Sequence, residues 1–203
     1  MSVGHRNPPM SDSANPPDPA AGRRAKRTLL LIAAVCLAPI VASYVAYYLL
    51  PRDAKVNYGT LLPTAPAPAI EGTRPDDTPF RLLDLTGRWL VVVNAGGGCD
   101  AACSRALYAT RQARTMQGRD ADRIVRVWLV TDAAAPPAAV LDEHPGLVVA
   151  RVAAARAALL PGGPNTIVII DPLGNLVLRY PDDPDIKGIG RDLGRLLKAS
   201  RIG

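Results

Sequence analysis

The longest apolar stretch of the chain covers residues 28–50 and contains no charged side chain. Its 23 residues, at about 1.5 Å per residue in a helix, are enough to cross a hydrocarbon core about 30 Å thick. Tyr44, Tyr47 and Tyr48 lie near its distal end, and aromatic rings favour a membrane interface. A cleaved signal peptide would have a shorter apolar region, and no small-residue cleavage site follows Leu50. The pattern predicts a single transmembrane helix over residues 28–50.

Beyond residue 75, short apolar runs alternate with segments of helical spacing. The runs WLVVVNA (89–95) and IVRVWLVTD (124–132) are rich in β-branched and aromatic residues, which is typical of buried strands. Between them, the spacing predicts a helix over residues 100–117 that stops at Gly118. Further predicted elements are strands over residues 80–85 and 146–152, a hairpin over 166–180 and an amphipathic C-terminal helix. This order predicts an α/β fold whose mixed sheet is covered on both faces.

Composition marks the boundaries between the parts of the chain. Residues 1–27 begin with a stretch rich in Pro, Ser, Asn and Ala that has no apolar period, and they are predicted to form a disordered cytoplasmic tail. Residues 51–75 include LLPTAPAPAI, which predicts a Pro-rich, extended tether. The predicted globular domain then covers residues 76–203.

Charge next to the apolar stretch predicts its orientation. Four basic residues in Arg23–Arg27 precede it, whereas Arg52 and Lys55, offset by Asp53, follow it. The positive-inside rule then places the tail in the cytoplasm and the later residues outside. The predicted setting is a bacterial inner membrane with the C-terminal domain in the periplasm. The net charge of +6 is not concentrated in one run and aromatic residues make up only 4 %, so a nucleic-acid-binding surface is not expected.

Two of the three cysteines, Cys99 and Cys103, follow the first buried strand in the segment NAGGGCDAACS. The glycines end the strand and a helix begins near Asp100, so Cys99 falls at a helix N-terminus, where the dipole and the N–H groups stabilise a thiolate. Residues at i and i+4 of a regular helix have Cβ atoms about 5 to 6 Å apart, whereas a disulfide needs about 3.5 to 4.5 Å. The pair can therefore close only if Cys99 precedes the regular helix.

Three interpretations of this pair stay open on spacing alone. Reduced, the two thiolates can exchange with a disulfide or hold a soft ion such as Cu(I). The pair can also be a structural disulfide of an oxidising compartment, or two idle thiols. A bridge that spans three residues closes a very short loop and gives little entropic stabilisation. This argues for redox or metal chemistry.

Several motifs together resemble the Sco/SenC family. They are a membrane anchor, a tether, DLTGRW before an apolar strand, C-x-x-x-C at the start of a helix and IDPLG in a hairpin. The family consists of thioredoxin-fold assembly factors for cytochrome c oxidase. The resemblance implies a thioredoxin-like fold and assigns Cys99 and Cys103 to the pair that binds copper and exchanges thiol for disulfide in that family. The partners it implies are cytochrome c oxidase subunits or other periplasmic thiol proteins.

The chain departs from the family's pattern at its candidate copper site. Asp100 stands where the family has a proline after its first cysteine, and residues 162–166 lack the histidine that completes the family's copper site. His144, the one histidine outside the tail, is either a substitute ligand or an ordinary surface residue. Pro164 is either the cis-proline that faces the cysteines in thioredoxin-like proteins or a plain turn proline.

The sequence thus predicts a membrane-anchored thiol–disulfide oxidoreductase that assists assembly of the oxidase copper site. In this prediction the Cys99 thiolate attacks a partner disulfide and Cys103 resolves the mixed disulfide. The alternatives are a Cu(I) metallochaperone without redox turnover, with Cys99 and Cys103 as ligands, and an inactive assembly scaffold.

Overall fold

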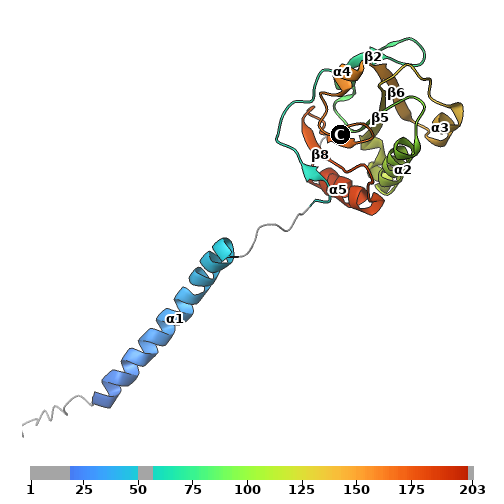
Figure 1. Cartoon of the computed structure of the whole chain (residues 1–203). Coiled ribbons are helices and arrows are strands. Elements are labelled where there is room, and N and C mark those ends of the chain that lie inside the picture. The colour runs from blue at the N-terminus through green and yellow to red at the C-terminus, as the bar shows by residue number, and fades with distance from the viewer. Residues whose placement is uncertain (1–18, 50–56, 201–203) are drawn as a thin grey trace, which may run out of the picture. The chain divides into compact units, whose positions relative to one another are not determined.

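The computed structural model describes residues 19–49 and 57–200, and the chain divides into two compact units, residues 1–54 and 55–203. The described part of the first unit is one helix, α1 (Pro19–Leu49) (Figure 1). Its start corrects the predicted disordered tail, because residues 19–27, rich in the good helix formers Ala, Arg and Lys, extend the apolar helix. Residues 1–18 and 50–56 lie outside the described residues, and on them were predicted the rest of the tail, the last residue of the transmembrane helix and the beginning of the tether.

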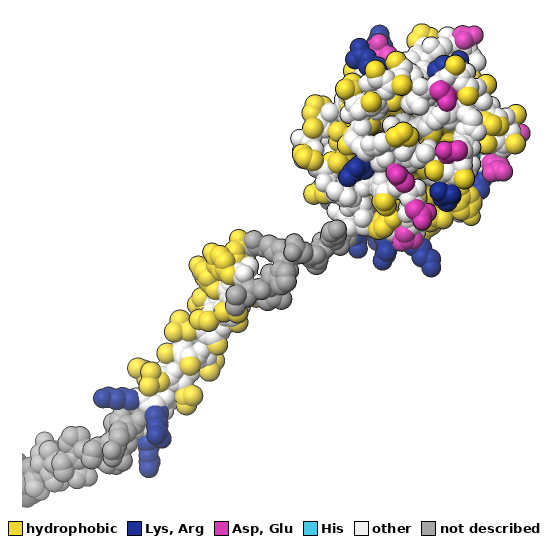
Figure 2. Space-filling view, in the orientation of Figure 1, with side chains coloured by type: hydrophobic (Ala, Val, Ile, Leu, Met, Phe, Trp, Pro, Cys, Tyr) yellow, Lys and Arg dark blue, Asp and Glu magenta, His cyan; other side chains and the backbone are white. Residues whose placement is uncertain are grey.

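Helix α1 contains residues 28–49 of the apolar stretch that the sequence predicted as a span. Lys26–Tyr48 has a mean hydropathy of 2.5 and is the one helical segment among the described residues long and apolar enough to cross a membrane. Its side chains are exposed, including the free thiol of Cys36. Figure 2 shows them as apolar surface beyond a group of Lys and Arg side chains at the beginning of the helix. An apolar surface of this length suits a hydrocarbon environment, which suggests that α1 anchors the protein in a membrane.

An eight-stranded mixed sheet, in the order β1-β8-β7-β4-β5-β6-β2-β3, forms the centre of the second unit. Strands β4, β5 and β6 run parallel, and β7 lies antiparallel on the other side of β4. The two apolar runs predicted as buried strands are β4 and β5, in which every residue is buried. The strands are β1 (Thr60–Leu61), β2 (Glu71–Thr73), β3 (Pro79–Arg81), β4 (Trp89–Ala95), β5 (Ile124–Val130), β6 (Leu147–Val152), β7 (Ile167–Ile170) and β8 (Leu176–Arg179).

Helices cover both faces of this sheet. The helices are α2 (Ala101–Thr115), α3 (Ala138–Glu143), α4 (Ala154–Ala157) and α5 (Ile186–Ala199), with 3-10 turns η1 (Leu82–Leu85) and η2 (Gly118–Arg123). Along β4, Val91 and Val93 point into the core under α2 and α5, whereas Leu90 and Val92 point into the core that contains Ala157 of α4. This alternation follows from the period of two in a strand. The predicted α/β class, with a mixed sheet covered on both faces, is confirmed.

The described part of the predicted tether belongs to the domain, so the boundary at residue 76 is wrong. Strand β1 pairs with β8, Pro66 forms a bridge to Asn175, and β2 pairs with β6. Ala67 and Ile70 are buried in the second core. The domain therefore includes residues 57–75, because these short Pro-rich strands find their partners far along the chain. The predicted strand over residues 80–85 is likewise short, since β3 ends at Arg81 and η1 follows.

A buried carboxylate fastens the beginning of the domain to its last helix. Asp192 of α5 is 1 % exposed and accepts hydrogen bonds from the N–H groups of Tyr58 (3.2 Å) and Gly59 (2.8 Å). It also accepts a hydrogen bond from the Tyr180 hydroxyl at 3.3 Å, and the Arg195 guanidinium lies 3.7 Å away. Burial, followed by the Asp192 carboxylate, raises the pKa of Tyr180. Segments more than 130 residues apart in sequence are joined at this point.

Candidate redox site

The site is built on the turn that joins β4 to α2. Strand β4 ends at Ala95 and α2 begins at Ala101, so the three glycines, Cys99 and Asp100 make the connection. At Gly97 a Cβ atom would collide with the carbonyl oxygen of Ala134, which follows β5. Glycine at this position therefore lets the turn pack directly against the loop after the neighbouring strand.

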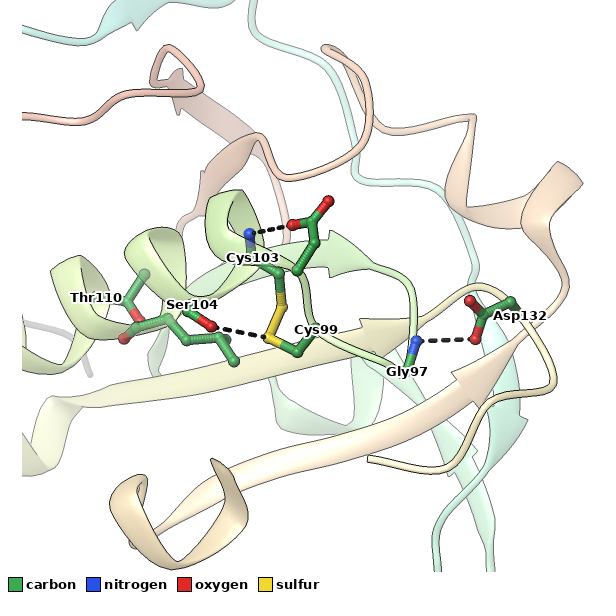
Figure 3. The surroundings of a disulfide bond; sticks show 8 residues. Gly97, Cys99, Cys103, Ser104, Thr110 and Asp132 are labelled. Carbon is green, nitrogen blue, oxygen red and sulfur yellow. Dashed lines mark hydrogen bonds between the residues drawn. A yellow bond between two sulfur atoms is a disulfide. The ribbon is translucent and has the colours of Figure 1, made fainter. Parts of the chain in front are cut away.

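Cys99 and Cys103 form a disulfide, with their Cα atoms 5.1 Å apart (Figure 3). Cys99 lies two residues before the first residue of α2, and its φ of +46° falls in the left-handed region that few residues other than glycine adopt. The geometric prediction is confirmed: the pair closes because Cys99 precedes the regular helix. Cys103 lies in the first turn of that helix.

The two sulfurs differ in access. Cys103 is only 1 % exposed and packs in the core under α2, whereas Cys99 is half-buried at the rim of that core. The Ser104 hydroxyl lies 3.9 Å from the Cys99 sulfur and can donate to it. An incoming sulfur can thus approach Cys99, while Cys103 lies behind it.

Asp100 caps α2 and changes what the helix terminus can offer a thiolate. Its carboxylate accepts a hydrogen bond of 2.8 Å from the N–H of Cys103. One of the N–H groups expected to stabilise a Cys99 thiolate is therefore already engaged, and the carboxylate offsets the positive end of the helix dipole. The sequence marked Asp100 only as a departure from a family pattern. The preference of aspartate for the N-cap position was the signal that could have revealed its capping role.

Asp132 is a site residue that the sequence interpretation missed. It follows β5, and its carboxylate accepts a hydrogen bond of 2.8 Å from the N–H of Gly97 (Figure 3). The same carboxylate accepts a second hydrogen bond, of 3.1 Å, from the N–H of Ala134. Because β4 and β5 are parallel, their carboxyl ends meet at one edge of the sheet, which brings Asp132 to the glycine turn. An aspartate at the end of the second parallel strand was the available signal.

The second unit of the chain resembles a known family of domains. The sequence model of one family, described as a transmembrane-like, thioredoxin-like C-terminal domain, matches residues 89–200, more than half of the chain. The chain belongs to this family. A search of curated proteins by sequence found no match.

Solved structures similar to this thioredoxin-like domain include Sco proteins. Copper-bound ScoI of Bradyrhizobium japonicum is 17 % identical with a TM-score of 0.52, over 64 % of this chain and 99 % of that one. Apo Sco1 of Thermus thermophilus is 20 % identical with a TM-score of 0.52, and the match covers 72 % of this chain and 98 % of that one. The thioredoxin domain of a Bacteroides vulgatus thiol-disulfide oxidoreductase is 17 % identical with a TM-score of 0.50, and the match covers 67 % of this chain and 99 % of that one. At these identities the likeness is one of fold, and it confirms the predicted thioredoxin-like fold.

The structure of the thioredoxin-like domain places His144 away from the cysteines. His144 precedes β6, whose first residue pairs with Arg126 in the first half of β5, whereas the cysteines follow the opposite, carboxyl end of β4. Only 4 % of its surface is exposed, and its Nδ1 atom is buried without a hydrogen-bond partner. Burial, followed by the positive charge of Arg126, lowers the pKa of His144. The expectation of a surface residue is wrong, and this position does not suit a copper ligand beside the cysteines.

Pro164 lies near the site but not in the predicted geometry. The peptide bonds of the described residues are all trans, so the cis-proline prediction is wrong. The neighbouring N–H of Asn165 donates to the carbonyl of Asn94 in β4, 2.7 Å away. This contact holds the exposed loop of Pro164 at the end of β4. The peptide bond before Pro164 is trans, and Asn165 adopts a left-handed backbone conformation with a φ of +63°.

The donor set for a metal consists of the two sulfurs. Within residues 19–49 and 57–200, no group of three or more His, Cys, Asp or Glu side chains is arranged to hold an ion. Once reduced, Cys99 and Cys103 offer the soft thiolates that Cu(I) prefers, and they are the residues that could hold it. The three-ligand arrangement expected from the Sco resemblance does not fit the described residues.

Proposed function

We propose that this domain exchanges thiol for disulfide with a partner protein. The observation that carries the proposal is the Cys99–Cys103 disulfide at the head of α2, with one sulfur accessible and the other buried behind it. The reduced Cys99 thiolate attacks one sulfur of the partner disulfide, which forms a mixed disulfide and releases the other partner sulfur as a thiolate. Cys103 then attacks the Cys99 sulfur, closes the intramolecular disulfide and releases the second partner thiol. Two electrons and two protons pass to the partner.

The proposed setting is a bacterial inner membrane that α1 crosses once, with the N-terminus in the cytoplasm and the domain in the periplasm. The basic residues before the apolar segment of α1 support this orientation. The disulfide supports an oxidising compartment. The proposed partner is a cytochrome c oxidase subunit whose copper-site cysteines require reduction, or another periplasmic thiol protein. The support for this partner is the likeness in fold to ScoI, which was solved with copper bound.

A complementation experiment tests this function. The full chain, a Cys99→Ser, Cys103→Ser variant and a Cys36→Ser control would be expressed in a bacterial strain that lacks the protein, and assembled oxidase would be measured by its haem spectrum and activity. We expect the parent and the Cys36 control to restore the oxidase and the double variant to fail. Full restoration by the double variant would overturn the proposal and favour a scaffold that acts without thiol chemistry.

Copper transfer by the same two sulfurs is the second candidate function. The observation that favours it is the pair of adjacent sulfur donors, which become thiolates on reduction. Anaerobic titration of the reduced full chain with Cu(I), in competition with a chelator, tests it. A carrier holds one ion per chain against the chelator, and loss of the ion to the chelator excludes this candidate while leaving thiol exchange intact.

A further inference from the structure

Two carboxylates lie on either side of the reactive turn. Asp100 is the residue next to Cys99, and its carboxylate lies 2.8 Å from the Cys103 nitrogen. Asp132 reaches the turn from the other side and lies 2.8 Å from the nitrogen of Gly97. Both residues are exposed, and neither forms an ion pair within the part of the chain that the structure describes. Their hydrogen bonds are to neutral N–H groups, so their charge is not cancelled.

Two arginines of this region make their contacts with other groups. Arg105, in the first half of α2, lies 3.8 Å from Asp183. Arg151 donates to the carbonyl of Ala133 at 3.4 Å, not to the carboxylate of Asp132. The residues that follow the two carboxylates in sequence are uncharged alanines, at 101–102 and 133–135. Asp100 and Asp132 therefore bring two unpaired negative charges to the turn of Cys99, in a chain whose net charge is +6.

We propose that Asp100 and Asp132 make the Cys99 sulfur selective for disulfides that carry positive charge close to the sulfur atoms. This inference deepens the proposed function and rests on it. A positive group next to the target disulfide is attracted toward both carboxylates as the sulfurs approach, whereas a negative group is repelled. The substrate class is then a disulfide in a basic segment of the partner, and acidic disulfides are poor substrates.

The selectivity can be measured on small disulfides that differ only in charge. The reduced full chain, in an uncharged detergent at low ionic strength, would be mixed with cystamine (cationic), 2-hydroxyethyl disulfide (neutral) or 3,3′-dithiodipropionate (anionic). In each case the Cys99 thiolate attacks one sulfur and expels one small thiolate. Cys103 then displaces the second, which yields two small thiols and the protein disulfide.

Three variants isolate the two carboxylates. Asp100→Asn and Asp132→Asn keep a side-chain oxygen that can accept the same hydrogen bonds, and they remove one charge each. Asp84→Asn removes the same charge from an exposed position on η1 and is the control. Each rate is divided by the rate with the neutral disulfide, so that a general change in thiolate reactivity cancels.

The expected result follows from Coulomb's law. Unit charges about 7 Å apart in water change a rate roughly two- to threefold, so one carboxylate separates cation from anion by about fivefold at low salt. We expect the cystamine to dithiodipropionate ratio to fall about fivefold in each single variant and more than tenfold in the double variant. The ratio should also shrink as salt is added and stay constant in Asp84→Asn.

The outcomes separate this inference from the function on which it rests. The first possible outcome is that the protein reduces the neutral disulfide, but the cystamine to dithiodipropionate ratio is the same in Asp100→Asn and Asp132→Asn as in the parent. This would overturn the selectivity and leave the thiol exchange standing. No reduction of any of the three disulfides would overturn the proposed function itself. A ratio that falls equally in Asp84→Asn would assign the preference to overall charge and overturn the roles of the two residues.

Discussion

The different burial of the two sulfurs predicts the order in which they react. When the reduced protein meets a limiting amount of iodoacetamide, Cys99 should be alkylated first. Its side chain is half-buried, whereas that of Cys103 is 1 % exposed and packs in the core under α2. The helix N-terminus stabilises a Cys99 thiolate less than its position predicts, because Asp100 already engages the N–H of Cys103. The order of alkylation therefore follows from the greater exposure of Cys99.

The expected rate ratio can be worked out from the contacts of Cys103. Reaching its sulfur requires the first turn of α2 to open, which breaks the hydrogen bond to the Asp100 carboxylate, worth about 1.5–3 kcal/mol. Opening also exposes a small apolar side chain, which costs roughly 1 kcal/mol. A total of about 3 kcal/mol corresponds to a reaction roughly a hundredfold slower at Cys103 than at Cys99.

Peptide mass spectrometry after a short pulse of reagent measures this ratio directly. The experiment uses the reduced full chain in detergent, and cleavage on the N-terminal side of aspartate separates Cys99 from Cys103 at Asp100. Cys36, on the apolar segment of α1 that the detergent covers, is quantified separately. Labelling of Cys103 first, or at the same rate as Cys99, would refute the order of attack and the assignment of Cys103 as the resolving residue.

Three further predictions concern the frame that holds the site. Asp192→Ala should lower the free energy of unfolding by about 3–5 kcal/mol in urea titrations, because it leaves three donors without their buried acceptor; a loss below about 1 kcal/mol would contradict this. The raised pKa of Tyr180 means that the folded state keeps a proton that the unfolded state loses above about pH 10. Stability should therefore fall by about 1.4 kcal/mol per pH unit above pH 10, and less steeply in Tyr180→Phe; equal slopes would argue against it. Gly97→Ala should lower the melting temperature by several degrees, because the added Cβ collides with backbone. Gly98→Ala, which has open space around the added Cβ, should melt like the parent. Equal melting temperatures of the two variants would contradict this prediction.

The sequence predicted those parts of the fold that have a local signature. Strands β4 and β5 are continuous apolar runs, and their burial follows from that composition. The position of Cys99 before the helix was predicted from the distance that a disulfide requires, and the structure confirms it. The apolar stretch of α1 was also clear from hydropathy alone.

The missed features depend on contacts between distant residues. Strand β1 has only two residues, in a Pro-rich stretch, and is recognised only by its pairing with β8, more than 100 residues later. His144 is buried because its loop packs near Arg126, which no local pattern reveals. Asp132 joins the site only because two parallel strands end side by side. Pairings of this kind leave no periodicity for the sequence to show.

The contact between Gly97 and Ala134 ties two loops into one mechanical unit. The glycine turn before Cys99 and the alanine- and proline-rich loop after β5 touch backbone to backbone, with no side chain between them to absorb a shift. A change in the length of residues 133–137 would therefore displace Cys99 without altering either cysteine. Relatives that keep the C-x-x-x-C spacing but vary the length of this second loop should differ in the reduction potential of the cysteine pair. Changes in the second loop can thus adjust the pair while both cysteines stay the same.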